Sequence, residues 1–218
     1  MSAGLKLDSV TIAIGGRRWF APVTLAVAPG ETVTVMGPSG SGKSSLLAYI
    51  CGTLDPGIVG QGAIELDGRS IENLPPEQRR IGILFQDDLL FPHMSVGDNL
   101  KFGLPVTIRR PSARQVRIEA ALEEAGLAGF AGRDPATLSG GERARVALLR
   151  TLLAEPRALL LDEPFGRLDA ALRQRFRQLV LDRARRKGLP VLLVTHDPED
   201  AAAAQGTILK LAGFTHSQ

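Results

Sequence analysis

The chain has 218 residues, of which 44% are hydrophobic and 5% aromatic, and its formal net charge at pH 7 is +3. This length fits one large domain or two small ones, and so small a net charge is by itself no argument for nucleic-acid binding. The single cysteine, Cys51, excludes an intrachain disulfide, and no stretch reaches the roughly 20 apolar residues of a membrane span. Because the N-terminus also lacks the apolar core of a secretion signal, we expect a cytoplasmic protein.

Residues 5–35 have the pattern of β-strands. Apolar side chains recur in residues 5–14 and alternate with polar ones in residues 23–27, and Pro29-Gly30 is a typical turn. The apolar run 32–36 then leads into a glycine-rich segment, and the apolar stretch 45–50 follows that segment. The sequence therefore predicts strand, loop and helix in that order.

The glycine-rich segment fills every position of the phosphate-binding pattern G-x-x-x-x-G-K-[ST]. Glycines let backbone N–H groups approach phosphates closely, and the following helix directs its positive end at them. Lys43 supplies a positive charge, and the Ser44 hydroxyl is a hard oxygen ligand suited to Mg²⁺. The alternative, a chance Gly/Ser-rich turn, does not account for the strand before it and the helix after it. We expect phosphates to be held by Gly37, Pro38, Ser39, Gly40, Ser41, Gly42, Lys43, Ser44 and Ser45.

The middle of the chain changes from strand to helix patterns. Residues 62–68 and 81–85 are predicted strands, whereas strand signals disappear between Asp87 and about Leu138. This stretch therefore looks like a helical insertion, with a helix from Ser112. The side chains expected to pack on the inner face of that helix are Val116, Ala120, Leu122 and Ala125.

Three clusters of basic residues occur in helical patterns, at residues 109–110, 143–150 and 173–187. Solvated helix faces are the simpler interpretation of such clusters, and a nucleic-acid surface is the alternative.

Two short apolar strands near the C-terminus end in chemically active side chains. The strand 157–161 is followed by Asp162 and Glu163, and the strand 191–194 is followed by His196. Asp162 could hold Mg²⁺ through its water shell, and Glu163 could orient or deprotonate an attacking water. Acidic residues also end buried strands for purely structural reasons. These carboxylates indicate nucleotide chemistry only because the chain also has the phosphate loop.

A second anion-binding helix terminus is predicted at residues 138–142, Leu-Ser-Gly-Gly-Glu. Ser139 caps the helix, while Gly140 and Gly141 expose backbone N–H groups. Taken alone, this segment is an ordinary helix cap. With the other motifs in this order, however, the chain resembles the ATP-binding cassette (ABC) ATPase family from about Leu5 to about Leu211.

The resemblance implies an α/β fold: a P-loop NTPase (RecA-like) core with a mixed or parallel sheet. It also implies an N-terminal antiparallel β subdomain and an inserted α-helical subdomain. Within a single ABC ATPase domain, residues 1–86 and 155–218 would form the catalytic core with the β subdomain. Residues from about 87 to 154 would form the helical subdomain that carries the signature motif.

In that family two subunits pack head to tail, and each ATP lies between the phosphate loop of one and the signature of the other. The resemblance implies that Ser139, Gly140 and Gly141 contact ATP on the partner subunit, and that Asp169 follows the dimer seam. Gln86 matches the glutamine that contacts Mg²⁺ and the water, and His196 matches the switch histidine at the γ-phosphate. The implied catalytic residues are Glu163, His196 and Gln86, and the implied Mg²⁺ ligands are Ser44, Gln86 and Asp162.

Three positions depart from the family pattern. Glu142 stands where Gln is usual in the signature, which we expect to leave the backbone donors unaffected. Gly166 stands where a small polar residue is often found. Ile14 lies where an aromatic ring commonly stacks on adenine, and Trp19 and Phe20 are close in sequence but out of register.

The segment 91–96, after Gln86, resembles the docking region of bacterial importer subunits. The segments 81–87 and 138–150 look closest to an uncharacterised, thiamine-importer-like subgroup. The resemblance implies an ATPase that powers transport through separate transmembrane permease subunits, with a solute-binding protein and without nucleic acid. The subunit would then be peripheral to the cytoplasmic face of the inner membrane, held there by the permease. Because few residues follow Leu211, we expect no C-terminal regulatory domain.

The apolar stretch 89–94 is the expected docking segment, and its alternative role is to fill the core of the helical insertion. Two other classes of protein are alternatives: a non-transport ABC ATPase acting on DNA or the ribosome, and a small-molecule kinase. The kinase would not account for the signature or for His196.

Overall fold

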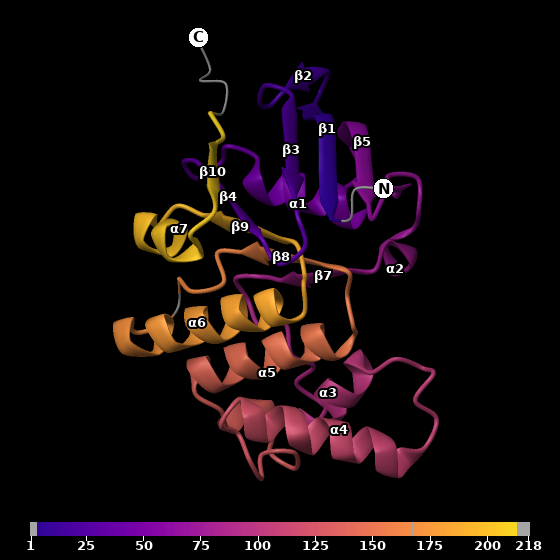
Figure 1. Ribbon diagram of the computed structural model, residues 1–218, viewed down its shortest axis with the longest axis vertical. Helices are drawn as coiled ribbons and strands as arrows, with labels where there is room; N and C mark the ends of the chain where they lie inside the picture. The colour runs from indigo at the N-terminus through magenta and orange to yellow at the C-terminus, as the bar shows by residue number, and fades with distance from the viewer. Residues whose placement is uncertain (1–3, 167, 213–218) are drawn as a thin grey trace. The chain divides into compact units, whose positions relative to one another are not determined.

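The computed structural model describes residues 4–166 and 168–212 (Figure 1). The chain divides into two compact units. The sheet unit contains residues 1–83, 157–163 and 181–218, and the helical unit contains residues 84–156 and 164–180. The predicted assignment of subdomain roles stays a prediction.

An antiparallel sheet forms the N-terminal part of the sheet unit. Its central strand, β1 (Leu5–Ile14), pairs with β2 (Arg17–Arg18), β3 (Val23–Val27) and β5 (Ile58–Leu66), and β6 (Arg69–Ser70) pairs with β5. Leu7 lies opposite both Leu25 and Ile64, so apolar side chains of three strands meet on one face. The pairing on both sides of β1 shifts register after Leu7 or Asp8, beside Ser9, whose φ is 53°.

The second sheet has the order β10-β4-β9-β8-β7. Its strands are β10 (Thr207–Lys210), β4 (Thr32–Met36), β9 (Val191–Thr195), β8 (Ala158–Asp162) and β7 (Ile81–Leu84). β10, β4, β9 and β8 run parallel to one another. Because parallel strands end at the same edge, Met36 lies opposite Thr195, and Asp162 lies opposite Val194.

The middle strands of this sheet are buried on both faces. Every residue of β9 and the first four of β8 are buried, as expected for central strands that helices cover. The helices of this unit are α1 (Lys43–Cys51), α2 (Pro76–Arg79), α7 (Pro198–Ala204) and the C-terminal part of α6 (Ala170–Arg186).

The core of the sheet unit joins α1 to both sheets. Leu46, Leu47 and Ile50 of α1 belong to one cluster with Leu7 of β1 and Leu160 of β8. Burial raises the pKa of the Cys51 thiol to about 12, so Cys51 stays protonated and behaves as the small buried hydrophobe predicted from sequence.

Arg79 fixes the C-terminal end of α1. Its buried guanidinium donates to the carbonyl oxygens of Tyr49 and Ile50 at 2.7 and 2.9 Å. It also donates to the carbonyls of Leu74 and Glu72, so the segment that precedes β7 is tied to the helix that follows the phosphate loop. A cation at a helix C-terminus is favoured by the helix dipole as well as by the hydrogen bonds.

The helical unit contains α3 (Val96–Gly103), α4 (Pro111–Glu124), α5 (Gly140–Leu153), the 3₁₀ turn η1 (Pro135–Thr137) and the N-terminal part of α6. Its core cluster includes Leu100 of α3, Leu122 of α4 and Leu149 of α5. Leu122 and Ala125 pack inward as predicted, but the predictions for Val116 and Ala120 are wrong, since Val116 is 69% exposed and Ala120 is also exposed. No helix among residues 4–166 and 168–212 has the length and apolar character needed to cross a membrane.

Candidate functional site

The phosphate loop joins the carboxyl end of β4 to the start of α1. Gly40 and Gly42 have φ values of 76° and 90°, which only glycine adopts without strain. Gly37 and Gly42 also have no room for a side chain. A Cβ at Gly37 would lie 2.5 Å from the carbonyl oxygen of Leu211, and one at Gly42 would lie 2.8 Å from the Phe20 ring. The loop is therefore fixed by its own glycines and by the ring beneath it.

Lys43 is almost fully buried, with its ammonium folded back on the loop. Nζ donates to the carbonyl oxygens of Gly37 and Pro38 at 2.9 and 2.8 Å. An ammonium group has three N–H donors, so Lys43 can stabilise the bend of the loop with two of them and still donate a hydrogen bond to an anion.

Ser44 and Asp162 approach each other from α1 and from the end of β8. The Ser44 hydroxyl is hydrogen-bonded to the Asp162 carboxylate. Burial raises the pKa of Asp162 and Glu163 adds to the rise, whereas the Ser44 bond and Lys43 oppose it. A divalent cation beside this half-buried carboxylate would offset the cost of its desolvation, and hydroxyl and carboxylate oxygens are the ligands Mg²⁺ prefers. The donor set therefore fits Mg²⁺.

Glu163 follows Asp162 in a strained backbone conformation. Its φ is 45°, in the left-handed region that non-glycine residues rarely occupy, and its N–H donates to the Val194 carbonyl at 2.9 Å. Its Oε1 lies 3.0 Å from Nδ1 of His196, which follows β9. The Glu163 side chain is 20% exposed and that of His196 is 62% exposed, so a carboxylate and an imidazole meet at an open edge.

Five residues that lie far apart in the sequence are thus brought to one edge of the parallel sheet: Lys43, Ser44, Asp162, Glu163 and His196. Asp162 was predicted to act beside the phosphate loop, and the structure places it there. The direct contact between Glu163 and His196 was not predicted, because it depends on the register of β8 and β9.

The signature residues open α5 in the helical unit. Ser139 is the N-cap, Gly140 and Gly141 form the first turn, and Glu142 completes a capping box with Ser139. Gly141 packs so closely on Leu172 of α6 that a Cβ there would lie 2.0 Å from a Leu172 methyl. Asp169 caps α6 by accepting a hydrogen bond from the Leu172 N–H at 2.9 Å, and Gln86 is exposed after β7. The predicted contacts of Gln86, Ser139, Gly140, Gly141 and Asp169 with a nucleotide stay predictions.

The position of the expected adenine-stacking ring is the last residue of β1. Ile14 is 40% exposed and pairs with Arg17 and Ile58. Phe20 is fully buried beneath Gly42, so the structure excludes it as a stacking ring. Trp19 is half-buried against the core of the sheet unit.

Sequence reasoning missed Asp88, which joins the segment after Gln86 to α5. The Asp88 carboxylate accepts from Nε of Arg143 at 2.9 Å, and its carbonyl accepts from Arg150 at 3.2 Å. Arg150 also donates to the carbonyl of Leu89 at 2.9 Å and lies over the Phe91 ring, 5.4 Å from its centroid. These partners are 55 to 62 residues apart, so no local pattern could have found them.

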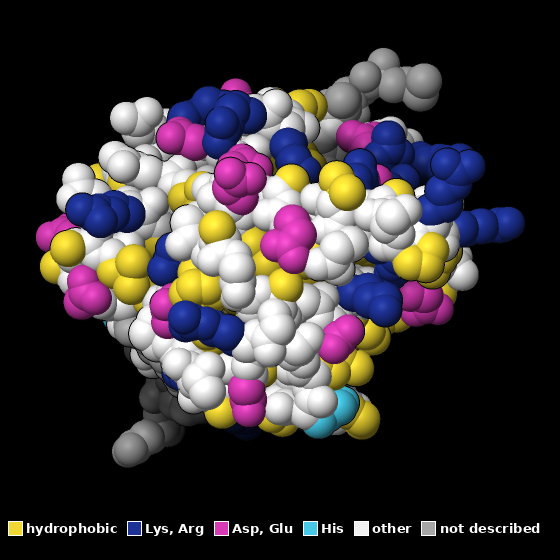
Figure 2. Space-filling view, turned by 90° about the horizontal axis from the view of Figure 1, so that it is seen from below, with side chains coloured by type: hydrophobic (Ala, Val, Ile, Leu, Met, Phe, Trp, Pro, Cys, Tyr) yellow, Lys and Arg dark blue, Asp and Glu magenta, His cyan; other side chains and the backbone are white. Residues whose placement is uncertain are grey.

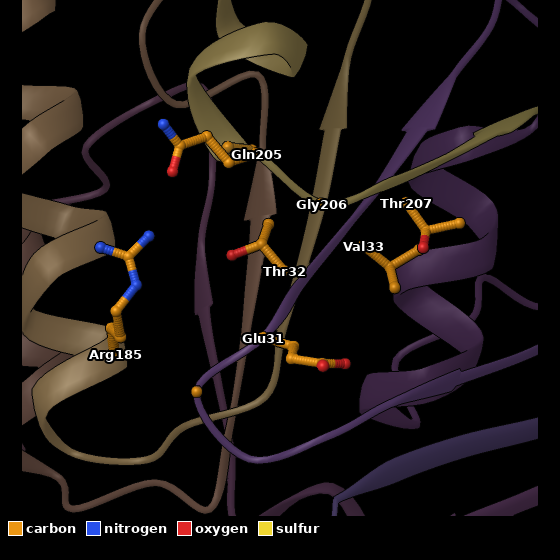
Figure 3. Close-up of a pocket in the computed structure, with 9 residues that line it drawn as sticks. Glu31, Thr32, Val33, Arg185, Gln205, Gly206 and Thr207 are labelled. Atoms are coloured by element: carbon orange, nitrogen blue, oxygen red, sulfur yellow. The ribbon is translucent and has the colours of Figure 1, made fainter.

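A polar cavity of about 460 Å³ lies at the opposite edge of the parallel sheet, where β4 and β10 begin (Figure 3). Arg185, Gln205 and Thr32 are among its lining residues. None of the residues that line it belongs to a predicted motif.

Comparison with known proteins identifies the family. Residues 20–166 match the ABC transporter family. The chain is 47% identical to an uncharacterised ABC transporter ATP-binding protein, YnjD, of Escherichia coli over 98% of this chain and 97% of that protein. It is 43% identical to the thiamine import ATP-binding protein ThiQ of Cereibacter sphaeroides, over 96% of this chain and 89% of that one. The chain therefore belongs to the ABC transporter family.

Longer relatives and a solved structure agree with this. The Fe(3+) ions import ATP-binding protein FbpC of Streptomyces avermitilis is 44% identical, and the chain spans 60% of its length. The dimeric structure of a post-hydrolysis state of the ATP-binding cassette MJ0796, bound to ADP and Pi, matches with a TM-score of 0.80. It is 32% identical in sequence, and the match covers 95% of this chain and 94% of that one. The predicted fold class is confirmed: the chain is an ABC ATPase, the ATP-binding and ATP-hydrolysing subunit of a transporter.

Proposed function

We propose that this subunit drives solute import by hydrolysing ATP at the Lys43–His196 edge of its parallel sheet, within a head-to-tail homodimer. The observation that carries the proposal is the convergence at that edge of a buried lysine, a hydroxyl–carboxylate pair and a carboxylate–imidazole pair. The import direction is supported by the names of relatives that span most of this chain, including ThiQ and FbpC.

Each group at the edge has a task in phosphoryl transfer to water. The loop N–H groups and Lys43 hold the β- and γ-phosphates, while Ser44 and Asp162 would hold Mg²⁺. When bound, Mg²⁺ neutralises charge that develops on the phosphate oxygens. Glu163 orients the attacking water and accepts its proton, and His196 donates a hydrogen bond to the γ-phosphate. Gln86 is the further residue that we propose contacts the Mg²⁺ and the water.

The Glu163–His196 contact suits a resting state. With its carboxylate held by the imidazole at 3.0 Å, Glu163 has a partner other than water. If the γ-phosphate accepted the hydrogen bond of His196 in place of Glu163, the Glu163 carboxylate could bind water. Hydrolysis would then follow only when the nucleotide is in place.

The signature of the second subunit completes each site. Ser139, Gly140 and Gly141 present the positive end of the 14-residue helix α5, which is the kind of terminus that binds phosphate. Asp169, the predicted seam residue, accepts a hydrogen bond from the Leu172 N–H, and the Leu172 side chain packs on Gly141 of the signature. Leu172 therefore links the predicted seam residue to the signature.

The permease would meet an apolar surface of the helical unit, formed by Leu89, Phe91 and Phe102 and called the docking surface below. Leu89 is 53% exposed and Phe102 is 66% exposed, and the rings of Phe91 and Phe102 meet edge to face, 4.9 Å between centroids. Leu90 instead packs on the core of the unit, which is the alternative role of the apolar stretch 89–94. An exposed aromatic and aliphatic patch of this kind indicates a partner.

Contacts with α5 give this surface a route to the ATP site. Arg150 and Arg143 hold the Asp88 segment from the two ends of the helix that begins with the signature. A displacement of the docking surface would therefore move α5 with it. The contacts of the signature would then differ between the two positions of α5, and coupling between two sites requires such a difference. Membrane association at the cytoplasmic face would then come from the permease, with a solute-binding protein supplying the substrate.

The arginine cluster on α5 does not favour nucleic acid. Arg143 binds Asp88 and the Leu138 carbonyl, and Arg145 donates to the Ala125 carbonyl at 2.8 Å. Figure 2 shows Lys and Arg side chains in separate groups, with acidic and hydrophobic side chains between them. The cluster is thus explained by contacts within the helical unit.

Phe102→Asp tests the docking surface. The side chain is 66% exposed, so we expect the variant to fold and to keep the native basal ATPase rate. Co-purification with a co-expressed permease should fall at least tenfold, because a buried charge in an apolar contact costs several kcal/mol. Ile208→Asp, a charge introduced at an exposed apolar residue of β10, is the control and should not affect co-purification. Normal permease binding by a folded Phe102→Asp variant would contradict the docking assignment.

Base selectivity should be weak, because Ile14 offers apolar contact without a stacking ring. GTP should compete with ATP for the subunit within roughly tenfold in Kd. Ile14→Tyr should tighten ATP binding by supplying a ring at the same position, where stacking contributes about 1 kcal/mol. Competition by fluorescent nucleotide displacement measures both values. A hundredfold preference of the native chain for ATP would mean that Trp19 supplies the stack.

A further inference from the structure

The N-cap of the signature helix is occupied by a carboxylate of the same chain. Oε2 of Glu142 accepts the Ser139 backbone N–H at 2.7 Å and the Ser139 hydroxyl at 2.8 Å. The Glu142 N–H donates in return to the Ser139 hydroxyl oxygen at 3.3 Å. The Ser139 backbone N–H is therefore paired with Glu142, while the expectation that glutamic acid leaves the backbone donors as glutamine would stays a prediction.

Glu142 is charged in this arrangement. The two hydrogen bonds from Ser139 hold the pKa of its carboxyl below the ordinary value, and Arg145 and Arg133 act in the same direction. An ionised carboxylate only accepts hydrogen bonds, whereas a glutamine amide both accepts and donates. Glutamine, which the family usually has at this position, would keep the cap through its side-chain oxygen. Its N–H₂ group would remain able to donate to an incoming phosphate.

We propose that Glu142 is an internal competitor for the signature helix, an intramolecular anion that the γ-phosphate on the partner subunit must displace before the dimer closes. The Ser139 hydroxyl has a single proton, which it now gives to Glu142, so donating to phosphate means releasing the carboxylate. The released carboxylate then lies within a few ångströms of a second anion, and like charges at that distance repel. The dimer of this ATPase therefore needs a higher ATP concentration to close than it would need with glutamine at position 142.

This inference rests on the proposed cross-subunit role of the signature. It predicts a gain of affinity from a mutation, which loss of helix capping cannot produce. Glu142→Gln keeps the shape of the side chain and one acceptor, while Glu142→Ala removes the Glu142 half of the capping box and should weaken the start of α5.

The experiment measures ATP-driven dimerisation by light scattering in a Glu163→Gln background and, for the native site, with a non-hydrolysable ATP analogue. Glu142→Gln should lower the ATP concentration at half-maximal dimerisation by about tenfold, the scale on which a neighbouring like charge acts. The gain should shrink at high salt, because screening weakens charge repulsion but leaves packing unchanged. Glu119→Gln, the same change on α4, is the matched control and should shift nothing.

Two outcomes separate this inference from the proposed function. If Ser139→Arg leaves ATP-driven dimerisation intact, the cross-subunit role of the signature fails, and the competitor role fails with it. If Ser139→Arg abolishes dimerisation while folded Glu142→Gln dimerises at native or higher ATP concentrations, or with a salt-independent gain, only the competitor role is overturned.

Discussion

Glu163→Gln is expected to bind ATP normally and to lose ATP hydrolysis on the order of 10²–10⁴-fold, the usual contribution of a positioned general base. An amide cannot accept the proton of the attacking water, but its oxygen can still lie where Oε1 now meets Nδ1 of His196 at 3.0 Å. The geometry of the edge should therefore survive while the proton transfer is lost. The variant should accumulate as an ATP-bound dimer, which size-exclusion chromatography with ATP will show.

Glu77→Gln is the control for that experiment, since it makes the same change at an exposed residue of α2 and should leave the turnover native. ATPase assays under single-turnover conditions separate the chemical step from ADP release. Near-native turnover by Glu163→Gln would show that Glu163 is not the general base. Its strained backbone, with φ at 45°, would then have no explanation in catalysis.

The second large effect is restoration of activity by mixing two inactive subunits. Lys43→Ala removes the buried ammonium of the phosphate loop, and Ser139→Arg places a bulky side chain at the signature. Each homodimer should then lack any intact composite site. A mixed dimer keeps one, formed by the native Lys43 of one subunit and the native Ser139 of the other. At equal amounts and free exchange, about a quarter of the native rate should return if one site can act alone.

A second mixture supplies the sharper control. Lys43→Ala and Glu163→Gln both damage the half-site that binds the phosphates, so their mixed dimer has no intact composite site and should stay inactive. Labelled native subunits must be shown to exchange under the same conditions. Recovery in both mixtures would contradict the head-to-tail arrangement, and so would recovery in neither if one intact site can act alone.

Much of the site was predictable because its motifs are local. The strand, loop and helix around residues 32–50 and the strands that end at Asp162 and His196 follow from apolar patterning and glycine placement. Parallel pairing then brings the strand ends to one edge, whatever the loops between them do. The helical unit was less predictable, since the side of α4 that faces its core could not be read from a mixed pattern. Val116 was predicted inside and is exposed, while Ile118 is buried.

By itself the sequence determined the family, the α/β fold class and the candidate residues for the chemistry, because each motif is a short run whose spacing its own backbone sets. Only the tertiary structure decided which of those residues touch. It placed Glu163 against His196, Phe20 beneath Gly42 and the Asp88 segment under Arg143 and Arg150. It also showed that Glu142 occupies the signature cap. Most of these contacts join residues tens of positions apart, and the strand register and helix packing that bring such residues together are set by burial of the whole core rather than by any local pattern.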